Sequence, residues 1–493
     1  NKMDFIELSV ARKNAYFTQT DEPLLSFTHE ENQFDDFIKE ILLPHRQSEH
    51  GPFMTKADVN ADGLDDVFVG GAKDQPASLF IQQAGGKFER SSKSTFMADK
   101  RHEDMNSVFF DVDGDTDLDL YVVSGSGEMY NKASGLLRDR LYLNDGQGNF
   151  DRAPQDALPN DLAGGSKALP YDLDGDGDLD LVVMNRNVPG EYPKGPESFI
   201  YINEGGRFVN ATKKMSSDFY ETSSMLVDGT FADLDGNGHD DLIVVGEWTA
   251  PQIYMNDGRD LEKASLDFEN LKGWWNRIVA TDIDNDGDMD FVLGNVGMNN
   301  KYHPKPDAPL LLFYNDFDNN GLGDIVLSKS NGGELLPVRG RECSSQQMPF
   351  ILQKFDNYEK FANADLTAIY TQERLDESLK LEVNNFSSGV LINNGDMNFE
   401  FKPLPRLAQI GAIKDIVLKD VNGDGLEDLH ISGASGQPSQ LFLQDSNGSF
   451  QLKNNSAFIK NKAYETVGAI FIDGDLDGDL DLYTVNGGNE KPS

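Results

Sequence analysis

The stretch that decides the fold is DLDGDGDLD, residues 172–180. Its positions 1, 3, 5 and 9 are Asp172, Asp174, Asp176 and Asp180, and the peptide carbonyl of position 7, Asp178, can face the same centre. Calcium takes roughly six to eight oxygen ligands of this kind. A glycine at position 6 permits the sharp turn, and strand-forming residues rather than a helix follow. The stretch therefore predicts a cation-binding turn on a β-hairpin.

The same nine-residue pattern occurs eight times, and four copies carry one Asn in place of an Asp. Position 7 binds through its carbonyl, so its side chain is free to vary. Clustered carboxylates repel one another unless a cation neutralises them, which favours metal loops over Asx-rich turns without metal. We expect about eight Ca²⁺ sites, because magnesium prefers to keep its waters. Besides the five residues above, the predicted ligands are Asp58, Asn60, Asp62, Leu64, Asp66, Asp111, Asp113, Asp115, Asp117, Asp119, Asp233, Asp235, Asn237, His239, Asp241, Asp282, Asp284, Asp286, Asp288, Asp290, Asp316, Asp318, Asn320, Leu322, Asp324, Asp420, Asn422, Asp424, Leu426, Asp428, Asp473, Asp475, Asp477, Asp479 and Asp481.

The spacing of the loops indicates a repeat architecture. Successive copies start 53, 61, 61, 49, 34, 104 and 53 residues apart. Most are followed by a second hairpin that runs from an aromatic-aliphatic-amide segment to a phenylalanine, as in Tyr142 to Phe150. Two hairpins per unit give four strands, and radial repetition of four-stranded sheets is the β-propeller design. We therefore predict an all-β propeller in which the acidic loop joins strands A and B of each blade and the amide turn joins strands C and D.

Eight blades are the favoured count, with seven as the alternative. The short distance from Asp282 to Asp316 places the sixth loop in a C–D turn of the fifth blade. The long gap after it then holds a sixth blade without an acidic loop, together with an insertion at about 330–385 that contains an amphipathic helix near 364–383. In this division the propeller spans 51–493. Residues 1–50 form an N-terminal segment with closing strands at 4–10 and 14–19 and a short helix at 34–43.

Composition restricts the partners. The formal net charge is −41, and eight divalent ions would leave about −25. Nucleic acid and anionic membranes need a basic footprint, so both are excluded as partners, and no apolar run is long enough for direct membrane insertion. The single cysteine, Cys343, allows no internal disulfide. Calcium is an alternative cross-link, and its millimolar level outside cells favours an extracellular or cell-surface location. The chain begins with Asn1, which suggests a removed targeting segment or a piece of a longer protein.

The loops resemble those of the FG-GAP/VCBS repeat family, whose propellers carry calcium loops like those of integrin α-chains. Four further segments are similar to large secreted bacterial surface proteins in which such propellers follow an ASPIC/UnbV-type module. These segments are residues 29–37, 42–45, 246–248 and 339–347. The resemblance implies an extracellular, calcium-stabilised and mostly non-enzymatic binding module, associated with the outer membrane of a Gram-negative bacterium.

A partner surface is expected on the upper face, opposite the acidic loops, where the B–C and D–A connections lie. All three tryptophans map to these connections, and aromatic rings with nearby polar groups suit a sugar or a peptide. The alternative is that the tryptophans only wedge blades together. The predicted ligand-binding residues are Arg186, Glu247, Trp248, Trp274, Trp275, Arg277, Asn295 and Tyr302.

The leading hypothesis for function is a non-catalytic module that binds a glycan or protein within a larger surface assembly. No catalytic residue is assigned, because no nucleophile elbow, HExxH motif or Cys/His metal spacing is present. The alternative is a carbohydrate-active enzyme, a polysaccharide lyase or hydrolase on a calcium-stabilised propeller. This alternative rests on analogy of fold, since a carboxylate pair could form on the upper face without a trace in the sequence.

Overall fold

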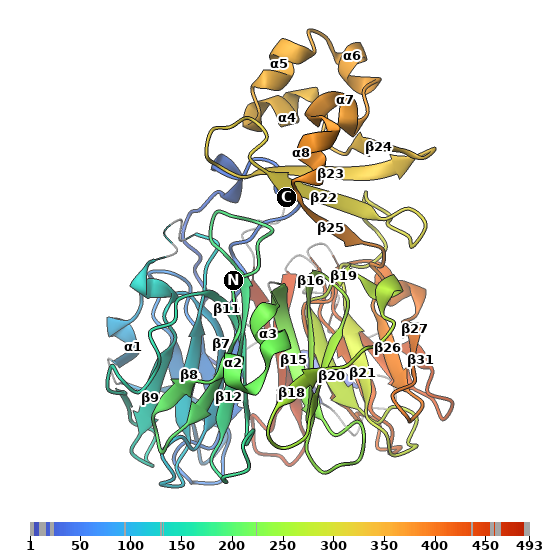
Figure 1. Ribbon diagram of the computed structural model, residues 1–493. Helices are drawn as coiled ribbons and strands as arrows, with labels where there is room; N and C mark the ends of the chain where they lie inside the picture. Colours follow the sequence, from blue (N-terminus) through green and yellow to red (C-terminus); the bar gives the residue numbers. More distant parts are fainter. Residues whose placement is uncertain are drawn as a thin grey trace.

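The computed structural model describes residues 4–8, 16–19, 24–92, 95–128, 131, 133–222, 224–434, 437–453, 458 and 465–487. It contains eight antiparallel sheets of at least four strands. Seven of these sheets stand side by side as the blades of a ring, and the eighth sits with a group of helices above one end of the ring (Figure 1). The prediction of a β-propeller is therefore confirmed.

The innermost strands of the seven blades are neighbours around the whole ring, including the last and the first. They run from the upper face to the acidic loops, and each leads through one loop into a B strand that begins with the position-9 aspartate. The A strands are β3 (Met54–Ala57), β7 (Asp104–Phe110), β11 (Gly164–Tyr171), β15 (Met225–Ala232), β20 (Arg277–Thr281), β28 (Ile416–Lys419) and β32 (Glu465–Ile472). The B strands are β4 (Asp66–Val69), β8 (Asp119–Ser124), β12 (Asp180–Asn187), β16 (Asp241–Thr249), β21 (Asp290–Gly294), β29 (Asp428–Ile431) and β33 (Asp481–Gly487).

The B strands are nearly continuous apolar runs because neighbouring blades cover both of their faces. Every residue of β8 and β12 is buried. The outer hairpins complete the blades. They are β5 (Ser78–Gln83) with β6 (Lys87–Arg90), β9 (Arg140–Asn144) with β10 (Phe150–Arg152), β13 (Phe199–Asn203) with β14 (Phe208–Asn210), β17 (Gln252–Asn256) with β18 (Leu261–Lys263), β26 (Gly389–Asn393) with β27 (Phe399–Pro403), and β30 (Gln440–Gln444) with β31 (Phe450–Lys453).

The seventh blade takes its outer strands from the start of the chain. Strand β1 (Asp4–Leu8) pairs with β33, and β2 (Phe17–Gln19) pairs with β1. The two closing strands expected near the N-terminus thus form the clasp, although residues 9, 10, 14 and 15 of that expectation lie outside the described residues. Closure of the ring leaves no exposed sheet edge between the first and last blades.

The favoured count of eight blades is wrong, because the eighth sheet lies outside the ring. Strands β21 and β26 are paired neighbours in the fifth blade, and the chain between them forms an inserted unit. Its sheet has the order β24 (Glu334–Pro337), β23 (Asp324–Asn331), β22 (Leu310–Asn315), β25 (Leu379–Val383). Five helices follow β24: α4 (Arg341–Gln347), α5 (Phe350–Lys354), α6 (Tyr358–Ala362), α7 (Leu366–Tyr370) and α8 (Gln372–Asp376).

Three expectations for this region are corrected. The loop at Asp316 is the β22–β23 turn of the inserted sheet and not a C–D turn of the fifth blade. The hairpin at 389–403 belongs to the fifth blade, so no separate sixth blade without a loop exists there. The stretch 364–383 is two short helices followed by a strand, because a bulky residue with positive φ, Thr371, separates α7 from α8.

The short helices are minor elements of the fold. They are α1 (Thr95–Ala98), α2 (Thr212–Met215), α3 (Ser217–Glu221) and the 3-10 turns η1 (Asp36–Ile38), η2 (Gly135–Leu137), η3 (Glu269–Leu271) and η4 (Arg406–Gln409). The helix expected at 34–43 is only η1, where the Asp35 side chain accepts a hydrogen bond from the amide of Phe37. Cys343 lies exposed on α4. No helix in the described part of the chain has the length and apolarity needed to cross a bilayer.

Side-chain amides join the outer hairpins of the first, second, third and sixth blades to the acidic loop of the preceding blade. The Asn203 Nδ2 donates to the carbonyl of Val112 at 2.8 Å, and the Asn144 Nδ2 donates to the carbonyl of Val59 at 2.7 Å. Gln444 does the same to Ile283, and Gln82 donates to the carbonyl of Asp473 at 2.7 Å. A cation that orders one loop would therefore also support the interface with the next blade.

Glycine is required where these hairpins meet the loops. Gly86 has φ +73° and its Cα lies so close to Asp475 that a Cβ atom would stand 2.6 Å from the Asp475 Cα. Gly206 has φ +88°, and a Cβ there would stand 3.1 Å from the Asp113 Cβ. Both positions therefore combine a left-handed backbone with close contact to a neighbouring loop.

The inserted unit packs on the upper face through the aromatic residues of the fourth blade. Trp248, Trp274 and Leu43 share one hydrophobic cluster with the core of the insertion, which includes Phe386 and Met348. The ring centroids of Trp248 and Trp274 are 5.1 Å apart, and those of Trp274 and Phe386 are 4.9 Å apart. Strand β19 (Gly273–Trp274) pairs with β16 and presents Trp274 to this cluster.

Candidate metal-binding loops and the upper-face cavity

All seven A–B turns of the ring and the β22–β23 turn of the insertion carry an acidic loop, as the sequence predicts for the A–B position. In the third loop, Asp172 accepts hydrogen bonds from the amides of Gly175 at 2.8 Å and Gly177 at 3.1 Å. Gly177 has φ +99°, so the chain turns tightly at position 6. These bonds wrap the backbone around the position-1 carboxylate and turn the other ligand positions inward.

Carboxylate oxygens of three ligand positions converge in most loops. One oxygen from each of Asp172, Asp174 and Asp180 lies within 4.8 Å of the others. The same holds for positions 1, 3 and 9 of the loops that start at Asp233, Asp282 and Asp316, and for positions 1, 3 and 5 of the loop at Asp111. Oxygens gathered at this spacing fit a hard divalent cation.

The position-9 aspartate also connects the acidic loop to the outer hairpin of its blade. Asp180 is completely buried; its Oδ2 accepts a hydrogen bond from the Leu173 amide at 2.8 Å, and its Oδ1 accepts one from the Asn203 amide at 2.7 Å. Asp66, Asp119, Asp241, Asp290 and Asp428 make the same pair of bonds, one to position 2 of their own loop and one to the end of strand C. One side chain thus joins the loop to the outer hairpin.

Burial makes these carboxylates costly without a cation. Burial raises the pKa of Asp180 to about 6, backbone amides oppose the rise, and the nearby Asp174 and Asp178 add to it. Burial likewise raises the pKa of Asp119 to about 7. A divalent ion would reverse this effect by favouring the ionised forms. The residues present therefore fit calcium in both geometry and charge.

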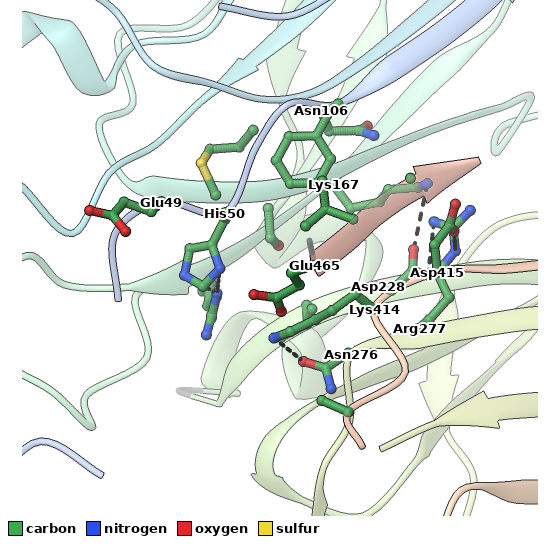
Figure 2. A pocket seen from close by; sticks show the side chains of 18 of the residues that line it. Glu49, His50, Asn106, Lys167, Asp228, Asn276, Arg277, Lys414, Asp415 and Glu465 are labelled. Carbon is green, nitrogen blue, oxygen red and sulfur yellow. Dashed lines mark hydrogen bonds and ion pairs between the residues drawn. The ribbon is translucent and has the colours of Figure 1, made fainter. Parts of the chain in front are cut away.

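A second feature lies at the opposite end of the ring, where a cavity of 530 Å³ opens among the starts of the A strands. All seven blades contribute to its wall, and the N-terminal segment lines one side with residues that include Glu49 and His50 (Figure 2). Its volume falls in the range of roughly 300–1,000 Å³ that is usual for small-ligand sites. Five basic and five acidic residues line it: Arg46, Lys167, Arg186, Arg277 and Lys414, and Glu49, Asp228, Glu247, Asp415 and Glu465.

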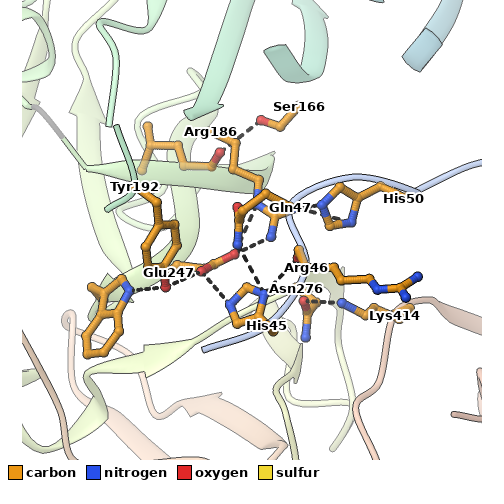
Figure 3. Close-up of polar contacts among 12 residues, drawn as sticks. His45, Arg46, Gln47, His50, Ser166, Arg186, Tyr192, Glu247, Asn276 and Lys414 are labelled. Carbon is orange, nitrogen blue, oxygen red and sulfur yellow. Dashed lines mark hydrogen bonds and ion pairs between the residues drawn. The ribbon is translucent and has the colours of Figure 1, made fainter. Parts of the chain in front are cut away.

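One wall of the cavity is a hydrogen-bonded network around Glu247 (Figure 3). Glu247 is buried and forms an ion pair with Arg186. The Arg186 Nε donates to the Glu247 Oε1 at 3.0 Å, and the Arg186 Nη2 donates to the same oxygen. His45 Nε2 lies 3.0 Å from its other oxygen, and the Tyr192 hydroxyl donates to the same oxygen at 3.3 Å. Burial alone would raise the pKa of Glu247, but Arg186 and His45 outweigh it and hold that pKa below its usual range.

The network continues to His50 and to a strained tryptophan. Arg186 Nη1 lies 2.6 Å from His50 Nε2, and burial together with Arg186 keeps the pKa of His50 well below its usual value. A neutral imidazole can accept this hydrogen bond. Trp248 has φ +60°, a conformation rarely seen for a bulky side chain, and its indole donates to the Tyr192 hydroxyl at 2.7 Å. Strain of this kind is concentrated at functional sites.

Most of the charges that line the cavity are paired with each other. Arg277 contacts Asp228 at 3.2 Å and Asp415 at 2.9 Å, and Lys167 lies 3.6 Å from Asp228. Lys414 is different: among the described residues it has no carboxylate within 4.0 Å, and its Nζ donates only to the Asn276 Oδ1 at 3.2 Å. Burial lowers the pKa of Lys414, and Glu465 partly opposes this.

The structure brings together four of the eight predicted ligand-binding residues. Arg186, Glu247, Trp274 and Arg277 line the cavity. Trp248 and Trp275 are buried away from it, and the Trp275 indole donates to the Leu271 carbonyl at 3.0 Å. Asn295 is fully buried, where its side chain accepts a hydrogen bond from the Val296 amide at 2.8 Å, and the Tyr302 ring packs against Trp274. The three tryptophans therefore fit the alternative of a packing role, because their indoles hold the insertion and the fourth blade together.

Sequence reasoning did not identify most of the wall. His45, His50, Lys167, Lys414 and Glu465 were given no role, although each lines the cavity. They come from the N-terminal segment and from the starts of three separate A strands. A signal that could have found them is their place in each repeat, just before or within an A strand, where a propeller directs side chains toward its axis.

Comparison with known proteins identifies the repeats. The FG-GAP-like repeat family matches residues 58–122, 111–183, 233–293 and 420–484, which together cover just over half of the chain. These matches contain all seven acidic loops of the ring and leave out the loop at Asp316. No curated protein sequence matches the chain.

Several solved structures are similar to this one. A lectin from Agrocybe aegerita that recognises non-reducing terminal N-acetylglucosamine is 15% identical, with 89% of this chain and 100% of that chain covered and a TM-score of 0.36. YCF48 bound to a D1 peptide is 9% identical, with 90% and 94% covered and a TM-score of 0.40. The Vibrio cholerae biofilm matrix protein Bap1 is 10% identical, with 90% and 89% covered and a TM-score of 0.29.

Proposed function

Because the chain belongs to the FG-GAP-like repeat family, we propose that it is a calcium-stabilised, non-catalytic binding propeller whose upper-face cavity receives a glycan or protein partner. The observation that carries the proposal is the division of the ring into two ends. Acidic loops occupy one end, and a cavity lined by all seven blades occupies the other. The loops make the scaffold rigid, and the cavity offers the concave, mixed polar surface that recognition needs.

The structural role of calcium follows from the position-9 aspartates. In six blades the position-9 carboxylate is buried between its loop and the C strand, and in the third loop the neighbouring carboxylates repel it electrostatically. A cation bound by positions 1, 3, 5, 7 and 9 would remove this repulsion while leaving the two backbone hydrogen bonds in place. We therefore expect calcium to act on stability and to bind in about eight loops.

An extracellular or surface location is part of the proposal. Calcium at millimolar concentration fills loops of moderate affinity outside cells, and a chain that stays acidic when loaded resists non-specific contact with nucleic acid. Association with an outer membrane or a larger surface assembly remains a prediction. It can be checked by fractionating cells that express the protein and by crosslinking it to its neighbours.

Glycan binding is tested by array screening of the calcium-loaded protein, followed by titration of each hit. A matched pair of variants locates the site: Val227→Phe narrows the cavity that Val227 lines, whereas Val209→Phe adds the same side chain on the exposed outer strand β14. We expect only the first substitution to abolish binding. Loss of binding in both variants, or in neither, contradicts the assignment of the cavity.

The glycans that bind in the array also decide between a binding module and an enzyme. A polysaccharide lyase leaves new unsaturated ends and a hydrolase leaves new reducing ends, while a binding module leaves the polymer unchanged. We expect no new ends after prolonged incubation with calcium. Accumulation of either product that stops in the Val227→Phe variant would favour the enzyme.

A further inference from the structure

We propose that the cavity binds a sugar through its carboxylate, so that the ligand is a terminal uronic acid held by Lys414 and Asn276. This inference rests on the proposed binding function and specifies its ligand. Lys414 precedes β28 in the sixth blade and Asn276 precedes β20 in the fifth, and the two side chains meet within the cavity (Figure 2). Together they offer an ammonium and an amide to the same region of space.

The basic side chains along the cavity wall are paired with carboxylates, with one exception. Arg186 is paired with Glu247, Arg277 with Asp228 and Asp415, and Arg46 with Glu49 at 2.6 Å. Among the described lining residues, Lys414 is the basic side chain with no carboxylate within 4.0 Å. Glu465 acts on Lys414 only from beyond ion-pair distance, so this half-buried ammonium has no directly paired carboxylate, and an incoming carboxylate can supply one.

Asn276 has unused hydrogen-bonding capacity beside the Lys414 ammonium. The Asn276 Nδ2 is buried and has no hydrogen-bond partner among the residues that the structure describes, while its Oδ1 accepts from Lys414. Asn276 therefore presents a free donor next to a cation. A carboxylate has two oxygens and can accept from both groups at once, whereas a single hydroxyl cannot satisfy both equally well.

Other lining residues of the cavity favour a sugar over a simple carboxylate. Glu465 extends into the cavity from the seventh blade and has no ion pair within 4.0 Å in the described part of the chain (Figure 2). Its carboxylate would repel a second anion but can accept hydrogen bonds from hydroxyl groups. The ring of Phe53 also lines the cavity and provides apolar contact for a sugar face. Anion, hydroxyls and an apolar face occur together in a uronic acid.

The overall charge of −41 sharpens the expected selectivity. A long polyanion would be repelled by the acidic surface, but a single carboxylate that enters the cavity meets a local balance of five basic and five acidic groups. We therefore expect recognition of one terminal acidic residue rather than of a highly charged chain along its length.

The test uses the full calcium-loaded chain and three probes: glucuronic acid, glucose and N-acetylglycine. Met54 and Met105 line the cavity, so ¹³C-methyl signals of these two residues report its occupancy directly. We expect glucuronic acid to shift both signals and to bind at least about tenfold more tightly than glucose, since a hydrogen-bonded charge is worth about 1.5–3 kcal/mol. N-acetylglycine, which carries a carboxylate without hydroxyls, should also bind more weakly than glucuronic acid.

Variants assign the preference to Lys414. Lys414→Met should reduce the affinity for glucuronic acid about 10- to 100-fold and leave that for glucose nearly unchanged. Lys414→Arg should retain most of the preference. Lys214→Met removes an exposed lysine of α2 and serves as the control, with no expected change. Thermal unfolding of each variant verifies that it is folded, and the preference of the unmodified protein stands as a test even if Lys414→Met does not fold.

The possible outcomes separate this inference from the proposed function. Equal binding of glucose and glucuronic acid, with shifts at Met54 and Met105, overturns the charge preference but keeps the cavity as a glycan site. Equal or tighter binding of N-acetylglycine replaces the sugar by a peptide-like carboxylate. If no glycan that binds the protein shifts either methionine signal, the cavity itself is rejected as the binding site.

Discussion

Replacing Asp180 by Asn tests whether the position-9 aspartates bind a cation or only accept hydrogen bonds. Asp180 is completely buried and accepts amide hydrogen bonds at 2.8 and 2.7 Å from Leu173 and Asn203. An asparagine keeps one acceptor oxygen and turns an NH₂ group toward the other amide. One buried backbone donor then loses its partner, at a cost of about 1–3 kcal/mol in the free energy of unfolding.

The charge that Asp180→Asn removes acts in the opposite direction when no metal is present. Burial raises the pKa of Asp180 from 3.8 to about 6. At pH 7 the ionised carboxylate therefore destabilises the metal-free fold by about 3 kcal/mol, which an amide would relieve. In excess chelator the two effects nearly cancel, and we expect a change in unfolding free energy within about 2 kcal/mol of zero.

In calcium the same substitution should be strongly destabilising. A site at a calcium concentration 1,000 times its Kd contributes about 4 kcal/mol to the free energy of unfolding, and loss of the ion removes this contribution in addition to the small net change expected in chelator. Urea unfolding followed by circular dichroism, in calcium and in chelator, measures both values. Asp178→Leu is the matched control because position 7 acts through its carbonyl and is leucine in three other loops. An equal penalty for Asp180→Asn in both media would refute cation binding at this position.

Asn203→Leu removes the amide that bonds the Val112 carbonyl at 2.8 Å, so we expect a loss of about 1–3 kcal/mol in both calcium and chelator, measured by urea unfolding; a loss confined to calcium would contradict a direct role in joining blades. The difference between the melting temperatures in calcium and in chelator should narrow from pH 7 to pH 5. Buried aspartates such as Asp119, whose pKa is raised to about 7, take up protons in this range, which stabilises the metal-free fold and weakens calcium binding. Calorimetry that shows a constant difference would contradict this. His430→Leu should raise stability by about 1–3 kcal/mol at neutral pH, since His430 is buried with both ring nitrogens unpartnered among the described residues; a lower melting temperature would show that the imidazole has a partner.

The repeated loops allowed the ring to be predicted, because their information is local. Nine residues specify a turn, a cluster of oxygens and the first residue of a buried B strand, and Asp180 performs all these tasks in its own blade. The position of the outer hairpin followed from its amide residue. The closing strands were also found, since alternation of side chains is visible even in short segments.

The same locality explains the wrong blade count. The loop at Asp316 satisfies the pattern as well as any other, but the pattern needs only a β-hairpin and does not encode which sheet contains it. Pairing of β21 with β26 closes over a long stretch of intervening chain, and only this contact excludes the insertion from the ring. The cavity was hidden for a related reason, because Lys167, Lys414 and Glu465 approach one another only after the ring has closed.

The insertion shows how one loop design can serve two purposes. In the blades, the Oδ1 of position 9 accepts a backbone amide from strand C, whereas Asp324 accepts the side-chain amide of Gln347 at 2.9 Å. Gln347 ends helix α4, and Arg374 of α8 also contacts this loop through Asn319. A cation there would order the helices rather than an interface between blades. The core of the insertion packs on Trp274, which also lines the cavity. A cation in the loop at Asp316 would therefore stabilise the cavity end of the propeller, whereas cations in the other seven loops would stabilise the ring.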